Sequence, residues 1–187
     1  AGRSSHAYGL WVAREEWKAR RTLQSHDAAE PTPFLIVIDG ASGSGDVKRT
    51  LGSLPTTGIC TPILIGGKTA DGAFHLKEPR HLSGFVEGEE AWLCILRAGD
   101  RLNPSALSIY ANAVRQSPNA GLIYADDDLM SSDGVRTAPH FKPDWNPDLL
   151  LGQNYTCHLS AFRTARLRAI GGFRSGLEGS QDYDLAL

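Results

Sequence analysis

Three continuous apolar runs give the chain its most regular pattern. They lie within the segments 33–40, 61–67 and 92–96, and continuous apolar runs of this kind are typical of strands buried on both faces of a parallel sheet. Residues 40–54 predict a glycine-rich turn and a short helix, and residues 103–116 predict a longer helix with Pro104 at its first position. A strand at 122–125 then completes a strand–helix–strand unit, which we expect to be right-handed.

The remaining segments are less regular. Residues 7–24 predict a peripheral helix packed by its tryptophans, 25–33 a linker, and 70–90 an irregular connection. Prolines at 143 and 147 argue against a regular helix in 140–150, so that segment is expected to be a loop near the site. Residues 157–173 predict a strand and a short helix ended by Gly171 or Gly172, with Leu149, Leu150 and Leu151 expected in the core.

These elements predict an α/β fold, with a mostly parallel Rossmann-like sheet flanked by helices. We divide the chain into an N-terminal helix and linker, 1–32, and a sheet-containing domain, 33–187, which we expect to continue beyond Leu187. With 187 residues and 41% hydrophobic content, the chain can bury one core.

Composition narrows the classes of partner. A formal charge of −2 argues against a nucleic-acid-binding protein. Cys60, Cys94 and Cys157 are widely spaced, which predicts neither a disulfide framework nor a zinc site. No apolar run approaches the about 20 residues that span a bilayer. We therefore expect a cytoplasmic location, with contact to the inner membrane surface made through other parts of a longer protein.

An aspartate triplet, Asp126, Asp127 and Asp128, follows the apolar residues of the strand at 122–125. The carboxyl edge of a parallel sheet is where ligands bind, and three adjacent carboxylates repel each other unless a cation, basic groups or water offsets their charge. The alternative is a solvated turn, since Ser131, Ser132, Asp133 and Gly134 follow. The local pattern leaves both open.

A second acidic cluster opens the last predicted helix. Ser180 is a candidate N-cap, which places Asp182 in the first turn. A carboxylate there is stabilised in its ionised form and held on a rigid element, as a general base requires. The alternative is helix-dipole capping by Asp182 or Asp184.

Two glycine-rich stretches suggest a phosphate loop, but neither has the required spacing. Asp46 and Val47 separate Gly45 from Lys48, and Pro62 stands where the first glycine before GGKT (66–69) should be.

Several ordered motifs carry a resemblance to a known family. They are YGLWVAREEW (8–17), LNPSALSIYANAVRQSPNAGLIY (102–124), YADDD (124–128), FKPDWNPDLLLGQNY (141–155), CHLSAFR (157–163), IGGFR (170–174) and EGSQDYDLAL (178–187). Together they resemble family 2 glycosyltransferases of the GT-A fold, especially the bacterial polysaccharide and O-antigen branch. The resemblance is close over residues 91–187.

The resemblance implies inverting transfer of a sugar from a nucleotide-diphosphate donor to the hydroxyl of a glycan or lipid-linked acceptor, with a divalent cation, Mg or Mn. It places the catalytic base at Asp182. Donor contacts are expected from Asp39, Arg97 and Asp100, and the metal ligands from Asp100, Asp126 and Asp128. Trp145 is a candidate for stacking on a sugar, and His158 for contacting acceptor or phosphate, although core packing is the alternative for each.

The chain departs from the family pattern in three places. Arg97 stands where the family has a metal-binding aspartate, Gly66 and Gly67 replace acidic residues, and the segment 70–90 is short. Arginine binds diphosphate in fork geometry, so Arg97 could take the place of the cation. The alternative is a glycosyltransferase-like module that has lost turnover and serves in binding or scaffolding. Similarly, the basic run at Lys18, Arg20 and Arg21 is a candidate lipid contact or a solvated helix face.

Overall fold

The computed structural model describes residues 2–24, 32–40, 44–56, 58–82, 84, 90–177 and 179–187. Its strands are β1 (Phe34–Asp39), β2 (Cys60–Ile65), β3 (Phe74–Leu76), β4 (Trp92–Arg97), β5 (Leu122–Ile123), β6 (Asp127–Met130), β7 (Arg136–His140) and β8 (Ala161–Arg163). Its helices are α1 (Gly2–Gln24), α2 (Ser44–Leu51), α4 (Ala106–Gln116), α5 (Pro147–Gly152), α6 (Thr164–Ala169), α7 (Gln181–Ala186) and the 3₁₀ turn η2 (Pro79–Leu82). Most of the predicted linker, 25–31, lies outside the described residues, so the boundary at 32/33 stays a prediction.

The central sheet is six-stranded and mostly parallel, in the order β3-β2-β1-β4-β8-β5. Strands β1 to β4 run parallel, whereas β8 is antiparallel to both of its neighbours. The chain proceeds outward from β1 to β2 and β3, then crosses to the other side of β1 to form β4. This reversal creates a crevice at the carboxyl ends of β1 and β4. The predicted Rossmann-like α/β fold is confirmed.

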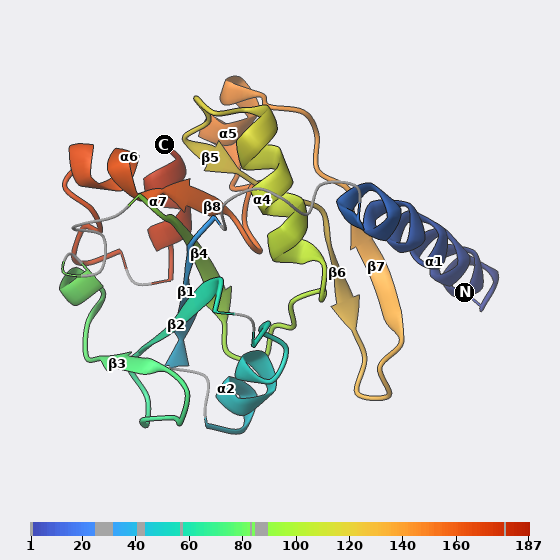
Figure 1. The fold of residues 1–187 in the computed structure, drawn as a ribbon, viewed down its shortest axis with the longest axis horizontal. Helices are drawn as coiled ribbons and strands as arrows, with labels where there is room; N and C mark the ends of the chain where they lie inside the picture. The colour runs from blue at the N-terminus through green and yellow to red at the C-terminus, as the bar shows by residue number, and fades with distance from the viewer. Residues whose placement is uncertain are drawn as a thin grey trace.

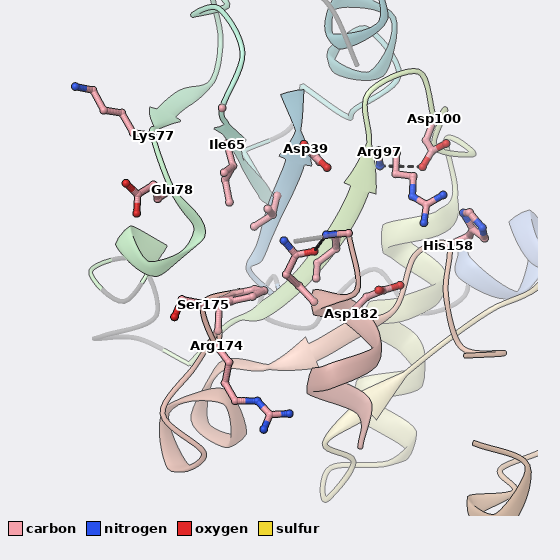
Figure 2. A pocket seen from close by; sticks show the side chains of 16 residues that line it. Asp39, Ile65, Lys77, Glu78, Arg97, Asp100, His158, Arg174, Ser175 and Asp182 are labelled. Carbon is pink, nitrogen blue, oxygen red and sulfur yellow. Dashed lines mark hydrogen bonds between the residues drawn. The ribbon is translucent and has the colours of Figure 1, made fainter. Parts of the chain in front are cut away.

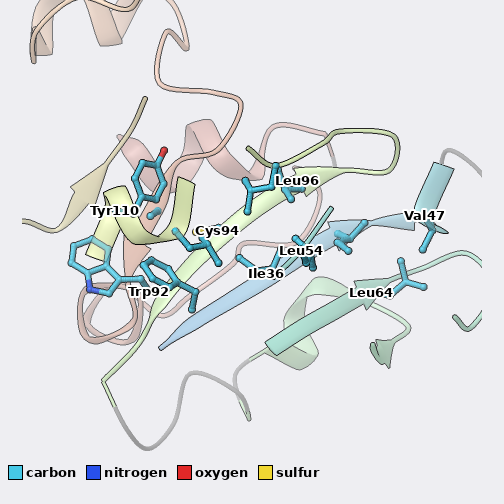
Figure 3. Close-up of a cluster of buried hydrophobic side chains, with 13 residues drawn as sticks. Ile36, Val47, Leu54, Leu64, Trp92, Cys94, Leu96 and Tyr110 are labelled. Atoms are coloured by element: carbon cyan, nitrogen blue, oxygen red, sulfur yellow. The ribbon is translucent and has the colours of Figure 1, made fainter. Parts of the chain in front are cut away.

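Two apolar cores lie on opposite faces of the sheet because successive strand side chains alternate between the faces. Ile36 and Ile38 of β1 face the core that Val47 of α2 and Tyr110 of α4 complete (Figure 3). Leu35 and Val37 face the second core, which α6 and α7 cover through Leu167 and Leu185. Burial of both faces explains why the strands read as continuous apolar runs rather than as alternating ones.

Helix α1 and the β6–β7 hairpin form a projection beside the sheet (Figure 1). The two lie side by side, and α1 also contacts α4. Trp11 and Trp17 are 39% and 57% exposed, so the expected packing of the helix by its tryptophans is only partly correct. In the part of the chain that the structure describes, no helix has both the length and the hydropathy needed to cross a membrane.

Four local predictions were wrong. A helix, α5, does begin in 140–150, because Pro147 occupies its first position, where no amide hydrogen is needed, and Asn146 caps it by accepting from the Leu149 amide at 2.9 Å. The segment 70–90 contains β3 and η2. Pro104 lies before α4, whose N-cap is Ser105. Leu151 is 74% exposed, whereas Leu150 is buried as predicted.

Candidate active site

The crevice at the carboxyl ends of β1 and β4 brings Asp39 and Arg97 next to each other. The two residues are register partners at the last paired position of these strands. Sheet pairing makes their Cα atoms neighbours, about 4.8 Å apart across the strands. The fold thus places a carboxylate and a guanidinium at the point where open α/β sheets bind their ligands.

The turn after β4 is held in one conformation. The Arg97 amide donates to the Asp100 carboxylate at 2.9 Å, and the Asp100 amide donates back to the Arg97 carbonyl at 3.0 Å. Thr50, which is fully buried in α2, accepts from the Gly99 amide at 2.9 Å. Gly99 has a φ of +108°, which is accessible to glycine. The backbone of Arg97 and the carboxylate of Asp100 are therefore fixed at the mouth of the crevice.

A cavity of about 380 Å³ opens above this edge. Its wall includes Asp39, Arg97 and Asp100 from the sheet edge, and Asp182 from the opposite side. In Figure 2 the Asp182 carboxylate points toward the side of the cavity where Arg97 and His158 lie. The cavity is of the size that binds small molecules. It brings together all four residues predicted to act as donor contacts or base, whose roles stay predictions.

Asp182 is the second residue of α7 and is half-buried. One carboxylate oxygen accepts from the Tyr183 amide at 2.9 Å and the other from the Asn154 side-chain amide at 3.1 Å. Asn154 is itself oriented, because its oxygen accepts from the buried Thr156 hydroxyl at 3.2 Å. The carboxylate is thus held by two donors with acceptor capacity remaining. Ser180 is the N-cap residue, but its side chain makes no capping hydrogen bond.

His158 stands on a strained turn. It and Leu159 have φ values of +61° and +64°, which are rare for side chains with a Cβ. Lys142, 1% exposed, donates to the Cys157 carbonyl and, at 3.2 Å, to the His158 carbonyl, while its charge pairs with Asp127 at 3.1 Å. The Tyr110 hydroxyl donates to the Leu159 carbonyl. His158 is exposed on the cavity wall, so the core alternative is wrong.

Cys157 lies close to the site but is not an activated nucleophile. Burial raises the pKa of its thiol, and this effect outweighs the opposing charge of Lys142. A raised pKa keeps the thiol protonated at neutral pH.

The aspartate triplet does not join Asp182 in the cavity. The triplet follows the carboxyl end of β5, as the strand-edge alternative expects, but Asp127 and Asp128 then begin strand β6, so the solvated-turn alternative is wrong. Asp128 accepts from Tyr8 and from Arg136, each at 2.6 Å. Asp126 accepts from the Lys142 amide at 2.8 Å. Arg136, paired with Asp128, and the Lys142 ammonium, paired with Asp127, therefore offset the repulsion within the triplet.

The side chains predicted to share a divalent cation, those of Asp100, Asp126 and Asp128, all line a groove beside the cavity, but they are not clustered around one point. Asp128 is engaged by Arg136 and Tyr8, and one Asp100 oxygen by the Arg97 amide. Within the described residues, no three His, Cys, Asp or Glu side chains are placed to hold a metal ion. The donor set does not fit the expected cation, and binding of Mg or Mn stays a prediction.

Sequence reasoning missed the residues that position the site. Asn154, Thr156 and Lys142 lie inside motifs that were recognised, but their spacing carried no signal that they support Asp182 and His158. Asn154 had one usable signal, an amide side chain in the polar segment between two predicted elements. Trp145, expected near the site, is 54% exposed and lies outside the lining of the cavity.

Comparison with known proteins gives two curated relatives. The O-antigen biosynthesis protein RfbC of Myxococcus xanthus is 34% identical over 152 residues, 81% of this chain and 12% of RfbC. The uncharacterized protein y4gI of Sinorhizobium fredii is 45% identical over 97 residues, 52% of this chain and 11% of that protein. The chain thus spans about a tenth of the length of these relatives. No family model matches the sequence.

A solved structure has the same fold. The crystal structure of S. aureus TarS 1–349 superposes with a TM-score of 0.56, covering 81% of this chain and 53% of that one. At 12% identity this likeness concerns the fold alone.

Proposed function

We propose that this chain is the donor-binding and catalytic domain of an inverting glycosyltransferase in polysaccharide synthesis. The observation that carries the proposal is the convergence of Asp39, Arg97, Asp100 and Asp182 on one open cavity at the switch point of the sheet. The similarity of the chain to an O-antigen biosynthesis protein, over 81% of its length, supports the same function. The resemblance of its motifs to family 2 glycosyltransferases supports it too.

In the proposed reaction, the Asp182 carboxylate takes the proton of an acceptor hydroxyl. The acceptor oxygen bonds to the anomeric carbon of the donor sugar, and the bond from that carbon to the diphosphate oxygen breaks. The nucleoside diphosphate leaves with the electron pair. Asn154 and the Tyr183 amide hold the Asp182 carboxylate in place, so the base is oriented before the acceptor arrives.

Arg97 is proposed to take the charge of the leaving diphosphate. Guanidinium binds two phosphate oxygens at once and stays charged at any physiological pH. Its backbone is fixed through Asp100 and Thr50, so its position is set before the donor binds. This assignment does not need the cation, which the carboxylates of the site are not arranged to hold.

The proposal is tested with Asp182→Asn and a matched control, Asp148→Asn. Asp148 occupies the same position in α5 that Asp182 occupies in α7, but outside the cavity. Release of nucleoside diphosphate is measured from UDP-, GDP- and dTDP-sugars, with water or methyl glycosides as acceptor. Loss of a general base should slow release about 10²–10⁴-fold.

Nucleotide affinity, measured by calorimetry with and without manganese, should be unchanged in Asp182→Asn and lost in Arg97→Ala. A wild-type rate in Asp182→Asn would reject the base assignment.

A second candidate function is a binding module without turnover. It is favoured by one observation, the absence of a shared carboxylate cluster among the described residues near Arg97. Nucleotide binding at Arg97 with no release of diphosphate from any of these donors would support it over the transferase.

A further inference from the structure

Exposed apolar side chains gather along one groove. Trp11, Ile109, Leu129, Met130 and Phe141 are between 39% and 65% exposed, and all five line a groove of about 850 Å³. They come from α1, α4 and the β6–β7 hairpin with the residue that follows it. Exposed apolar side chains concentrated in a groove mark a binding surface.

The groove adjoins the candidate active site. Asp100 and His158 line both the groove and the cavity that contains Asp182. His158 is fixed between them by its strained turn and by the contacts of Lys142. A molecule lying in the groove would therefore reach the edge of the cavity at these two residues.

The aromatic wall of the groove is held rigidly. The Trp11 ring stacks on Tyr8 at a centroid distance of 5.9 Å and meets Phe141 edge-on at 5.1 Å. The Tyr8 hydroxyl donates to Asp128 at 2.6 Å, and burial, followed by this bond, raises its pKa to about 12, so it stays a donor at neutral pH.

A chain of ion pairs fixes α1 against the hairpin. Arg136 bridges Asp128 of β6 and Glu16 of α1, and Glu16 also accepts from the Asn103 side-chain amide at 2.8 Å. Trp11 is therefore presented to the groove without a large entropic cost on binding.

We propose that this groove binds a saccharide and serves as the acceptor site. Aromatic rings stack on the apolar C–H face of a sugar, and Trp11 and Phe141 offer such rings at the groove surface. Sugar hydroxyls need hydrogen-bonding partners, and Asp126 and Arg101 are exposed along the same groove. An acyl chain would desolvate these two charges without satisfying them. The name acceptor rests on the proposed transfer reaction, whereas saccharide binding itself does not.

The test is saturation-transfer NMR on the full chain, with methyl glycosides of glucose, galactose, mannose, rhamnose and N-acetylglucosamine. Trp11→Ala and Phe141→Ala should each raise the Kd of the glycosides that bind by about tenfold or more. Trp11→Phe should lose less, because a ring remains. Trp17→Ala is the matched control, because Trp17 lies on the same helix, is 57% exposed and lies outside the lining of the groove. The Kd of the glycosides for this variant should equal that for wild type.

Absence of binding by every glycoside, or wild-type affinity in both Ala variants, would overturn the proposal and favour a protein segment as the occupant. Two separate aromatic variants guard against misfolding of either one. Calorimetry with UDP, GDP and dTDP distinguishes failure of the saccharide site from failure of the proposed transferase. Glycoside binding that depends on Trp11, without nucleotide binding, supports the saccharide site and rejects the transferase; nucleotide binding without any aromatic effect rejects the saccharide site alone.

Discussion

A carboxylate acts as a base only if its lone pairs are aimed at the proton it removes. The Asp182 carboxylate is oriented by two hydrogen-bond donors on different segments, the Tyr183 amide within α7 and the Asn154 side chain before β8. Asn154 can only present its amide nitrogen to Asp182, because Thr156 donates to its oxygen. This relay gives Asn154 a positioning role that is separate from substrate contact.

Asn154→Ala should therefore lower the rate of diphosphate release by about 10²-fold, the cost of a misplaced catalytic group, with little change in nucleotide affinity. Asn154→Asp removes the amide donor and places a second carboxylate beside Asp182, so it should lower the rate at least as much as Asn154→Ala. A purely structural role would lower stability without lowering the rate of the folded protein. Gln153→Ala, at an exposed neighbouring position, is the control and should match wild type in rate.

For single residues, the sequence predicted the charged side chains of the site better than the side chains that hold them in place. Asp39 and Arg97 end strands, Asp100 lies in the turn directly after β4, and Asp182 lies in the first turn of α7. The position of a side chain at such places follows from topology, and all four line the cavity. Asn154, Thr156 and Lys142 lie in connecting segments, where the backbone path is set by tertiary contacts that no local pattern encodes.

Among the elements, the hairpin and the segment before β8 depend on one buried cation. Lys142 follows β7, and its 1% exposed side chain bonds to Asp127 of β6 and to two carbonyls of the strained turn. A buried charge is tolerated because each of its donors finds a partner. The hairpin thus braces the turn that carries His158.

Lys142→Met keeps the length of the side chain but leaves Asp127 and both carbonyls short of a donor. We expect a loss of about 3 kcal/mol in the free energy of unfolding. Urea denaturation measures it, with faster amide exchange expected at residues 157–159. Lys68→Met, at an exposed lysine, should change stability by less than about 0.5 kcal/mol. Equal stability of the two variants would contradict the bracing role.

Elements with a strong apolar run were predicted correctly, since two-sided burial imposes an unmistakable pattern on β1, β2 and β4. The β6–β7 hairpin was missed because its register depends on charge pairs. Aspartates are poor strand formers, yet Asp127 and Asp128 enter a strand because Lys142, His140 and Arg136 face them from β7 and the residues after it. Helix α5 was missed because proline was weighed as a breaker and not as a first residue.

The whole molecule has two parts with different bases of stability. Among the described residues, neither apolar core contains a side chain of α1, whereas α2, α4, α6 and α7 contribute to one core or the other. Helix α1 is instead attached by polar contacts of Glu16 and Tyr8 and by the aromatic contact of Trp11 with Phe141. The sheet carries the candidate donor site, and α1 completes the groove.

A variant lacking residues 1–24 should therefore separate the two sites. The sheet should stay folded, with Tm lower by about 2–8 °C, because only part-exposed ion pairs and one aromatic contact are lost. Nucleotide affinity should stay within about twofold of wild type, since none of the α1 side chains that the structure describes lines the cavity. Glycoside binding should disappear with Trp11. Arg136→Ala, which breaks the bridge to Glu16 but keeps Trp11, should weaken glycoside binding only partly and expose α1 to limited proteolysis. If the deletion unfolds the sheet or abolishes nucleotide binding, α1 is part of the donor-binding domain, and the proposed separation of groove and donor site is wrong.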